Sequence, residues 1–267
     1  MNYDEGADFA DKRKFINDLF ELLTTAGIED YGDWLSLEVG GEGGVLAGLL
    51  ASRFAHVVSS DIVHAQFVYG GDFLGLLREK FKRQNERMEF NKVEFLTADA
   101  QNLPFRDAWF HFCFSQNAFE HIADPELALL EAFRVTRPGG FVYVMFDPVW
   151  TADSGSHFLE AIGEPWLHLI ETDEEITRRM LSRGASALDV KHYCSHMNRR
   201  PVNYYREMFA RVVGKKNATV VYHHEWSGCV DPSYFTHPNL DAAAQFLNLT
   251  HEQLLVRGFR YLIKLAG

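Results

Sequence analysis

Hydrophobic and polar positions along the chain switch between a helical and a strand-like period, so the pattern predicts an α/β protein. Over residues 9–26 apolar side chains recur at helical spacing, charged residues fill the other face, and Gly27 ends the run. Two short apolar runs at 34–39 and 57–60 have the length of strands, with a helix over 45–54 between them. Strand, glycine turn, helix and strand in this order predict a βαβ unit.

The same alternation continues through the middle of the chain. Asp124 followed by Pro125 and Glu126 is typical of a helix start, because the carboxylate caps free amides and proline suits the first turn. We expect this helix to pass through Leu127, Leu130 and Phe133 and to end at 137–140. A further helix is predicted over 73–88, with Leu74, Leu77 and Phe81 facing inward, and strands over 93–97, 109–115 and 141–146.

The last third is richer in helical patterns. A capping box at 172–175 opens a helix toward Gly184, another helix covers 202–213, and 240–256 is partly helical. Two last strands are expected at 218–226 and 258–265. Since no linker or repeat interrupts the chain, we predict one domain. Its parts are a helical segment at 1–30, a cofactor-binding core at 31–147, an insertion at 148–217 and the last two strands within 218–267.

Composition narrows the classes of partner. Apolar residues make up 47% of the 267 residues, and the formal net charge is −11, so a nucleic-acid backbone is not the expected partner. No run of apolar residues is long enough to span a bilayer, and the acidic start lacks the pattern of a secretory signal. The three cysteines are widely spaced, which favours reduced thiols. We therefore expect a cytoplasmic protein; a homodimer is left open.

The segment from Glu38 to Gly44 carries the strongest chemical signal. Glycines after a strand let the backbone approach a ligand, and Asp61 at the tip of the next strand can accept hydrogen bonds from a ribose. The turn departs from the Gly-x-Gly-x-x-Gly spacing of dinucleotide sites, and Glu42 would repel a pyrophosphate. S-adenosylmethionine has a sulfonium and no phosphate, so it suits an acidic turn better. A nicotinamide-dependent oxidoreductase and a non-catalytic interaction module stay as alternatives.

Five sequence blocks in order resemble the class I S-adenosylmethionine-dependent methyltransferases. They are 37–44, 59–61, 98–105, 115–122 and 137–140. The resemblance implies a Rossmann-like, doubly wound sheet of seven mostly parallel strands with the last one antiparallel, helices on both faces, and a helical insertion after the fifth strand. Two departures are Glu42 in place of a glycine and His111 in place of the usual aspartate. The cofactor contacts that the resemblance implies are Glu38, Gly40, Gly41, Gly43, Asp61, Ile62, Asp99, Ala100 and Gln116.

For the acceptor side, histidines are the natural candidates, because methyl transfer to a hydroxyl gains from a general base. His121 follows the fourth strand, while His157 and His168 lie in the insertion. Aromatic, amide and guanidinium groups of the insertion suit a sugar or a carboxylated small molecule. We therefore expect a hydroxyl of a sugar or glycan-like natural product as acceptor, with small-molecule N-methylation as the alternative. The insertion groups are Trp150, Trp166, Asn198, Arg199, Arg200, Tyr204 and Tyr205.

No metal is predicted. His192, Cys194 and His196 could share one face only if their segment were a strand, and no fourth ligand is nearby. His223 and His224 are expected on opposite faces of a strand, with neither in catalysis.

Overall fold

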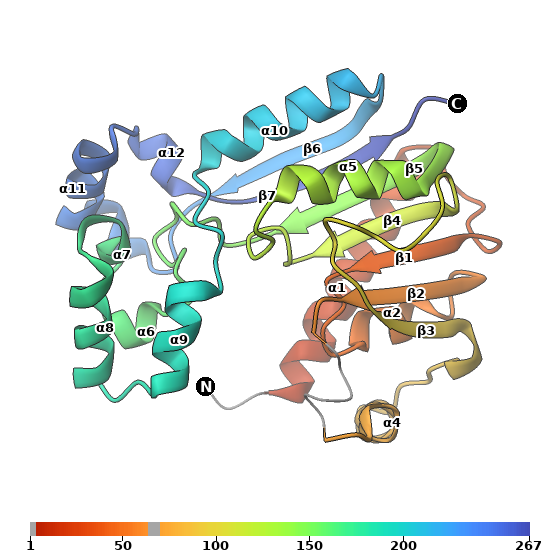
Figure 1. The fold of residues 1–267 in the computed structure, drawn as a ribbon, viewed down its shortest axis with the longest axis horizontal. Helices are drawn as coiled ribbons and strands as arrows, with labels where there is room; N and C mark the ends of the chain where they lie inside the picture. Colours follow the sequence, from red (N-terminus) through yellow and green to blue (C-terminus); the bar gives the residue numbers. More distant parts are fainter. Residues whose placement is uncertain (1–3, 64–69) are drawn as a thin grey trace.

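The computed structural model describes residues 4–63 and 70–267, which leaves the first three residues of the predicted N-terminal segment outside the described part. A single seven-stranded sheet runs in the order β3-β2-β1-β4-β5-β7-β6 (Figure 1). Strands β1 to β5 pair in parallel, whereas β7 is antiparallel to both β5 and β6. The predicted topology is confirmed. The strands are β1 (Leu35–Val39), β2 (His56–Asp61), β3 (Val93–Thr97), β4 (Phe110–Gln116), β5 (Thr136–Phe146), β6 (Thr219–Ser227) and β7 (Val256–Lys264).

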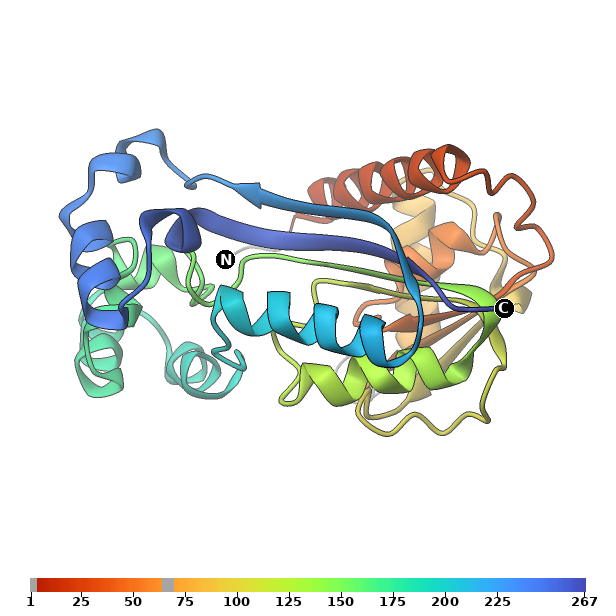
Figure 2. The same ribbon diagram turned by 90° about the horizontal axis from the view of Figure 1, so that it is seen from above.

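Helices cover both faces of the sheet (Figure 2). One face carries α1 (Glu5–Thr25) and α2 (Val45–Leu50). Beside them, against β3, lies α4 (Phe73–Arg83), which leads through η1 (Phe90–Lys92) into β3. The other face carries α5 (Pro125–Val135) and α10 (Val202–Lys215). Such three-layer packing buries both faces of the central strands, which explains their nearly continuous apolar sequences.

Strand β4 shows how the sequence divides between the two cores. Phe112 and Phe114 pack with α1 and α2, while Cys113 between them packs with α5 and α10. All three are buried. Alternate side chains of a strand point to opposite faces, so an uninterrupted apolar run supplies two cores at once.

Local capping signals held in the structure. Asp124 Oδ1 accepts hydrogen bonds of 3.1 Å from the amides of Glu126 and Leu127 at the start of α5. Thr172 and Glu175 form the expected capping box on α8 (Asp173–Ser182). Each device satisfies amides that the first helical turn leaves without an intrahelical partner.

Some boundaries differ from prediction. Helix α2 ends at Leu50 and α4 at Arg83, several residues before the predicted ends. Leu74 is 42% exposed, and the inward position at the start of α4 belongs to Phe73. The segment 137–140, where the helix was expected to end, lies instead within β5, since α5 already ends at Val135. The pairing of β5 with β4 shifts register along this segment. A Cβ at Gly140 would lie 2.7 Å from the His111 carbonyl oxygen, so this glycine permits β5 to come close to β4.

Six of the described helices gather beyond the carboxyl ends of β1 and β4, and we call this group the helical cap (Figure 1). Four of them follow β5, as predicted for the insertion, and two lie between β6 and β7. Trp166 and Leu169 of the insertion pack with Leu240 and Leu254, so the two segments share a core. The cap consists of α6 (Leu159–Ile162), α7 (Leu167–Ile170), α8, α9 (Ala187–Ser195), α11 (Pro238–Leu247), preceded by η2 (Pro232–Thr236), and α12 (His251–Leu255).

None of the helices in the described part of the chain combines the length and apolar character that a bilayer-spanning helix needs.

Candidate functional site

Glu38 and Gly41 meet at the carboxyl end of β1. The Glu38 carboxylate is buried and accepts a 2.6 Å hydrogen bond from Ser59 Oγ on β2. Burial raises the pKa of Glu38 to about 7. A Cβ on Gly41 would lie 2.7 Å from Glu38 Oε2 and 1.9 Å from Ser59 Oγ. Only glycine lets the backbone pass this close, so the turn lies directly against a buried acid.

Asp61 ends β2 and holds the same turn from its other side. Its Oδ2 accepts the amide of Glu42 at 2.9 Å, and its Oδ1 accepts the amide of Val63 at 2.8 Å. Ile62 between them is 68% exposed. An exposed apolar side chain beside a fixed carboxylate fits a ligand that has a hydroxylated sugar next to a flat base.

The third and fourth strands complete this edge of the sheet. Asp99, after β3, is exposed and accepts hydrogen bonds from the Gln101 amide at 2.9 Å and from its side chain at 3.0 Å. Ala100 packs against the core. Gln116, at the end of β4, is buried, and its Oε1 accepts a 3.2 Å hydrogen bond from Lys12 Nζ of α1. Sequence reasoning missed Lys12, since nothing local to α1 indicates its position over β4.

The glycine turn also lies close to the segment that follows β4. Gly40 has a positive φ of 78°, and a Cβ there would lie 2.3 Å from Ala118 Cβ. Gly44 also has positive φ, at 72°, and is the N-cap of α2. Gly43 lies between them and is partly exposed. The predicted contacts on β1, β2 and β4 thus lie along one edge, although they come from residues 38 to 116.

Two of the three candidate histidines are brought together just beyond this edge. One ligand-type atom each from Glu120, His121 and His157 lie within 4.8 Å of one another. The rings of His121 and His157 are 5.0 Å apart between centroids, and those of His121 and His196 are 4.1 Å apart. Burial lowers the pKa of His121 to about 4 and that of His157 to about 3, so both are neutral near pH 7.

Glu120 is a functional candidate that sequence reasoning missed. Its side chain is 1% exposed, and burial raises its pKa well above the ordinary value. The sequence feature that could have identified Glu120 as a candidate is its position next to His121, in the block that follows β4. Sequence alone does not reveal that this carboxylate points inward.

His168 lies elsewhere. It is buried, its Nε2 lies 2.9 Å from the Trp150 carbonyl oxygen, and its ring meets Trp150 edge-on. Burial lowers its pKa to about 4. These contacts fix the start of the insertion.

Most of the insertion groups expected to line an acceptor pocket are engaged inside the protein. Asn198 Nδ2 donates to the carbonyls of Phe119 and Ile122 at 2.7 and 2.8 Å, which clamps the turn that carries His121. Arg199 pairs with Asp173 at 2.8 Å. Trp166 and Tyr205 are buried in hydrophobic clusters. This leaves Trp150, Arg200 and Tyr204 partly or fully exposed.

The histidines for which no catalytic role was expected lie on α9 and β6. Positions 192 and 194 lie on α9 and His196 caps its end, so the segment is a helix and the three side chains do not alternate as on a strand. His223 and His224 lie on β6, where the first stacks on Tyr261 and the second on Trp226.

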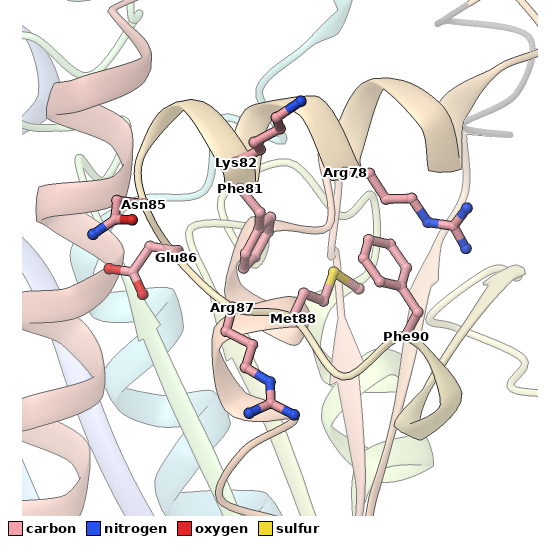
Figure 3. Close-up of a pocket in the computed structure, with 8 residues that line it drawn as sticks. All are labelled: Arg78, Phe81, Lys82, Asn85, Glu86, Arg87, Met88 and Phe90. Carbon is pink, nitrogen blue, oxygen red and sulfur yellow. The ribbon is translucent and has the colours of Figure 1, made fainter.

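A hollow of about 460 Å³ lies between α4 and η1 (Figure 3). Most of its lining side chains are basic or apolar, among them Arg78, Arg87 and Phe90, and Asn85 and Glu86 complete it. Because α4 leads into the amino end of β3, this hollow lies near the amino ends of the strands, whereas Asp61 lies at the carboxyl end of β2. Open α/β sheets bind ligands at the carboxyl edge, so we do not assign it to the site.

Residues 37–144 match a family model described as a methyltransferase domain. The ubiquinone/menaquinone biosynthesis C-methyltransferase UbiE of Brucella anthropi is 33% identical over 120 residues, which are 43% of this chain and 42% of that protein. An uncharacterized methyltransferase of Mycobacterium is 38% identical over 63 residues, or 24% of this chain and 25% of that one. The chain therefore spans less than half of the length of these curated relatives.

Solved structures share the fold over almost the whole chain. A Bacillus halodurans protein provisionally named a methyltransferase aligns with a TM-score of 0.54 at 17% identity, covering 94% of this chain and 100% of that one. Geranyl diphosphate C-methyltransferase of Streptomyces coelicolor, solved with Mg²⁺, geranyl diphosphate and S-adenosyl-L-homocysteine, gives 0.54 at 11% identity, covering 95% and 80%. At these identities the likeness establishes the fold alone.

Proposed function

The chain belongs to the class I S-adenosylmethionine-dependent methyltransferases, and from this premise we propose that it methylates a small-molecule acceptor. The observation that carries the proposal is the joint position of Glu38, Gly41 and Asp61 at one edge of the sheet. A buried acid, a turn that admits only glycine, and a fixed acid on the next strand are the features a nucleoside with a cationic amino-acid arm requires.

The residues fit S-adenosylmethionine. Glu38, buried beside the bare backbone of Gly41, would receive the amino group of the methionine arm, because a cation there offsets the desolvation of the carboxylate. Asp61 would hold the ribose hydroxyls and Ile62 would pack against the adenine. We assign Asp99 and Ala100 to the adenine edge, and Gly40, Gly43 and Gln116 to the methionine side.

Methyl transfer is a displacement at carbon, so the protein mainly aligns the acceptor and excludes water. His121 and His157 would face the acceptor, since the turn that carries His121 adjoins Gly40 through Ala118 and the ring of His157 lies against that of His121. His168 would act indirectly, by positioning Trp150. Two polar imidazoles favour a hydroxyl over an apolar acceptor.

A sugar or glycan-like hydroxyl stays our first acceptor class. Its support now rests on Trp150, Arg200 and Tyr204, because the other insertion groups are engaged internally. A carbon acceptor is the second candidate, favoured by the names of the Brucella and Streptomyces proteins. Small-molecule N-methylation is the third.

The test has two parts. S-adenosylhomocysteine is expected to raise the melting temperature of the purified full chain, whereas NAD is expected to leave it unchanged. The protein is then incubated with methyl-labelled S-adenosylmethionine and sugar nucleotides, glycosides, phenols, quinols and amines. Label on hydroxyls supports the first class and label on ring carbons supports the second. A shift with NAD and none with S-adenosylhomocysteine would overturn the proposal.

A further inference from the structure

Glu120 is a buried carboxylate without a matching cation. Its side chain is 1% exposed, and neither of its oxygens has a hydrogen-bond partner among the described residues. Among the described ion pairs, its one contact is His121 Nε2 at 3.7 Å from Oε1. Burying polar oxygens without hydrogen-bond partners costs folding free energy, so such a group is expected to serve a ligand.

The two neighbouring histidines present ring nitrogens to the same place. His121 Nδ1 lies 3.0 Å from the His196 carbonyl oxygen, and a carbonyl only accepts, so Nδ1 carries the proton. The lone pair of His121 is then on Nε2, the atom facing Glu120. His157 Nε2 is also buried without a hydrogen-bond partner in the described part of the chain.

We propose that Glu120, His121 and His157 form a binding site for one divalent transition-metal ion, of which Zn²⁺ is the one to which we commit. Two imidazole nitrogens and one carboxylate oxygen, with a fourth position open, are a ligand set of catalytic zinc sites. The bond from His121 Nδ1 to a backbone carbonyl is the outer contact that orients metal-binding histidines.

The distances allow this with small side-chain movements. The three ligand-type atoms lie within 4.8 Å of one another. Zinc bonds of about 2.0 to 2.2 Å in a tetrahedron place ligand atoms roughly 3.3 to 3.6 Å apart, so no separation has to shrink by more than about 1.5 Å. The Glu120 to His121 distance of 3.7 Å is already close to that value.

The backbone around the site is held by other contacts. The side chain of Asn198 holds the turn by donating hydrogen bonds to the carbonyls of Phe119 and Ile122. The backbone amide of Asn198 donates a 2.9 Å hydrogen bond to the Glu120 carbonyl. His157 has a positive φ of 65°, a conformation in which asparagine is better tolerated than most residues. This defines a substitution that removes the imidazole with little backbone strain.

Metal binding does not depend on methyl transfer, whereas one consequence rests on the proposed function. An acceptor hydroxyl in the open position would lose its proton to solvent water more readily, because a bound divalent ion lowers the pKa of a coordinated oxygen. A site with this ligand set would thus place the activating group beside the proposed acceptor.

The experiment measures metal directly. The full-length chain is stripped with a chelator, dialysed against ZnCl₂, and analysed for bound zinc; Co²⁺ absorption spectra report the ligands. One equivalent of zinc is expected, with cobalt bands typical of nitrogen and oxygen ligands and no thiolate charge-transfer band. Glu120→Gln and His157→Asn are each expected to weaken zinc binding at least tenfold, and circular dichroism checks their folding.

His223→Gln is the matched control, since His223 also lies near a carboxylate, with its Nε2 3.6 Å from Glu225 Oε1, but on exposed β6. It should bind zinc like the parent chain. Equal binding by the parent and the site variants, or no stoichiometric binding by the parent, would overturn the proposal. If the variants fail to fold, the parent's stoichiometry and cobalt spectrum still decide. Since S-adenosylhomocysteine binding is scored separately, failure of this site does not touch the proposed function.

Discussion

Ser59 on β2 donates a 2.6 Å hydrogen bond to the buried carboxylate of Glu38 on β1. This bond ties together the ends of two adjacent parallel strands, at the place where the chain turns toward α2. It lowers the pKa of Glu38, but the desolvation that burial imposes is larger and raises it to about 7. The acid therefore titrates near the physiological range in the free protein.

The first prediction concerns stability and pH. The ordinary pKa of a glutamate is 4.5, and that of Glu38 in the folded chain is about 7. Between these two pH values the folded chain keeps a proton on Glu38 that the unfolded chain releases. The free energy of unfolding therefore falls as pH rises through this window and levels above it, with a contribution of at most about 3 kcal/mol. Glu38→Gln should lose this component. Chemical denaturation of both proteins from pH 5 to 8 gives the difference, which cancels other acids such as Glu120; a pH-independent difference would contradict the prediction.

Asp61 is the second target. Its carboxylate holds the amides of Glu42 and Val63, and we assign it to the ribose. Asp61→Ala is expected to abolish the melting shift with S-adenosylhomocysteine, and Asp61→Asn to reduce it, because one acceptor oxygen remains. Glu94→Ala, an exposed acid on neighbouring β3, is the control and should keep the full shift. An unchanged shift in Asp61→Ala would remove this residue from the site.

Gly41 gives the third prediction. Alanine there would bring a Cβ to 1.9 Å from Ser59 Oγ, so the turn must move away from Glu38. We expect a stability loss of about 1 to 3 kcal/mol together with loss of S-adenosylhomocysteine binding. Gly32→Ala has nothing within 4 Å of the added Cβ and should match the parent in both measurements. Isothermal titration and thermal unfolding distinguish the two variants.

The fourth prediction tests how the helical cap is attached. Asp153 is fully buried and its Oδ1 lies 2.7 Å from Arg257 Nη1 on β7, so one ion pair joins the insertion to the sheet. Asp153→Ala leaves a largely buried guanidinium without its partner and should cost about 3 kcal/mol or more. Glu160→Ala, an exposed acid in the same insertion, should cost under about 0.5 kcal/mol.

The number of transitions in the unfolding curves of the parent and of Asp153→Ala tests the prediction that the chain forms a single domain. One transition in the parent and in Asp153→Ala would mean that cap and sheet unfold together. A separate early transition in the variant would show a cap that unfolds independently.

The hydrophobic pattern within each segment predicted most of the helices and strands, because the periodicity of a helix or strand is visible in its own residues. The capping residues Asp124 and Thr172 set helix starts through bonds to amides two or three positions away. Inward positions were predicted less well where tertiary packing decides them. Leu74 has the right spacing for an inward position, but Phe73 is the residue buried there, packed against Phe95 of β3.

By itself, the sequence determined the order of strands and helices, the glycine turn after Glu38 and the acid at Asp61, since each of these depends on neighbours in the chain. Only the tertiary structure decided that His121 and His157 meet beside a buried Glu120, and that α11 and α12 join the insertion in one cap. Such meetings depend on how separated segments fold back on one another, and on which side chains lose their water there. Spacing along the chain carries no record of either.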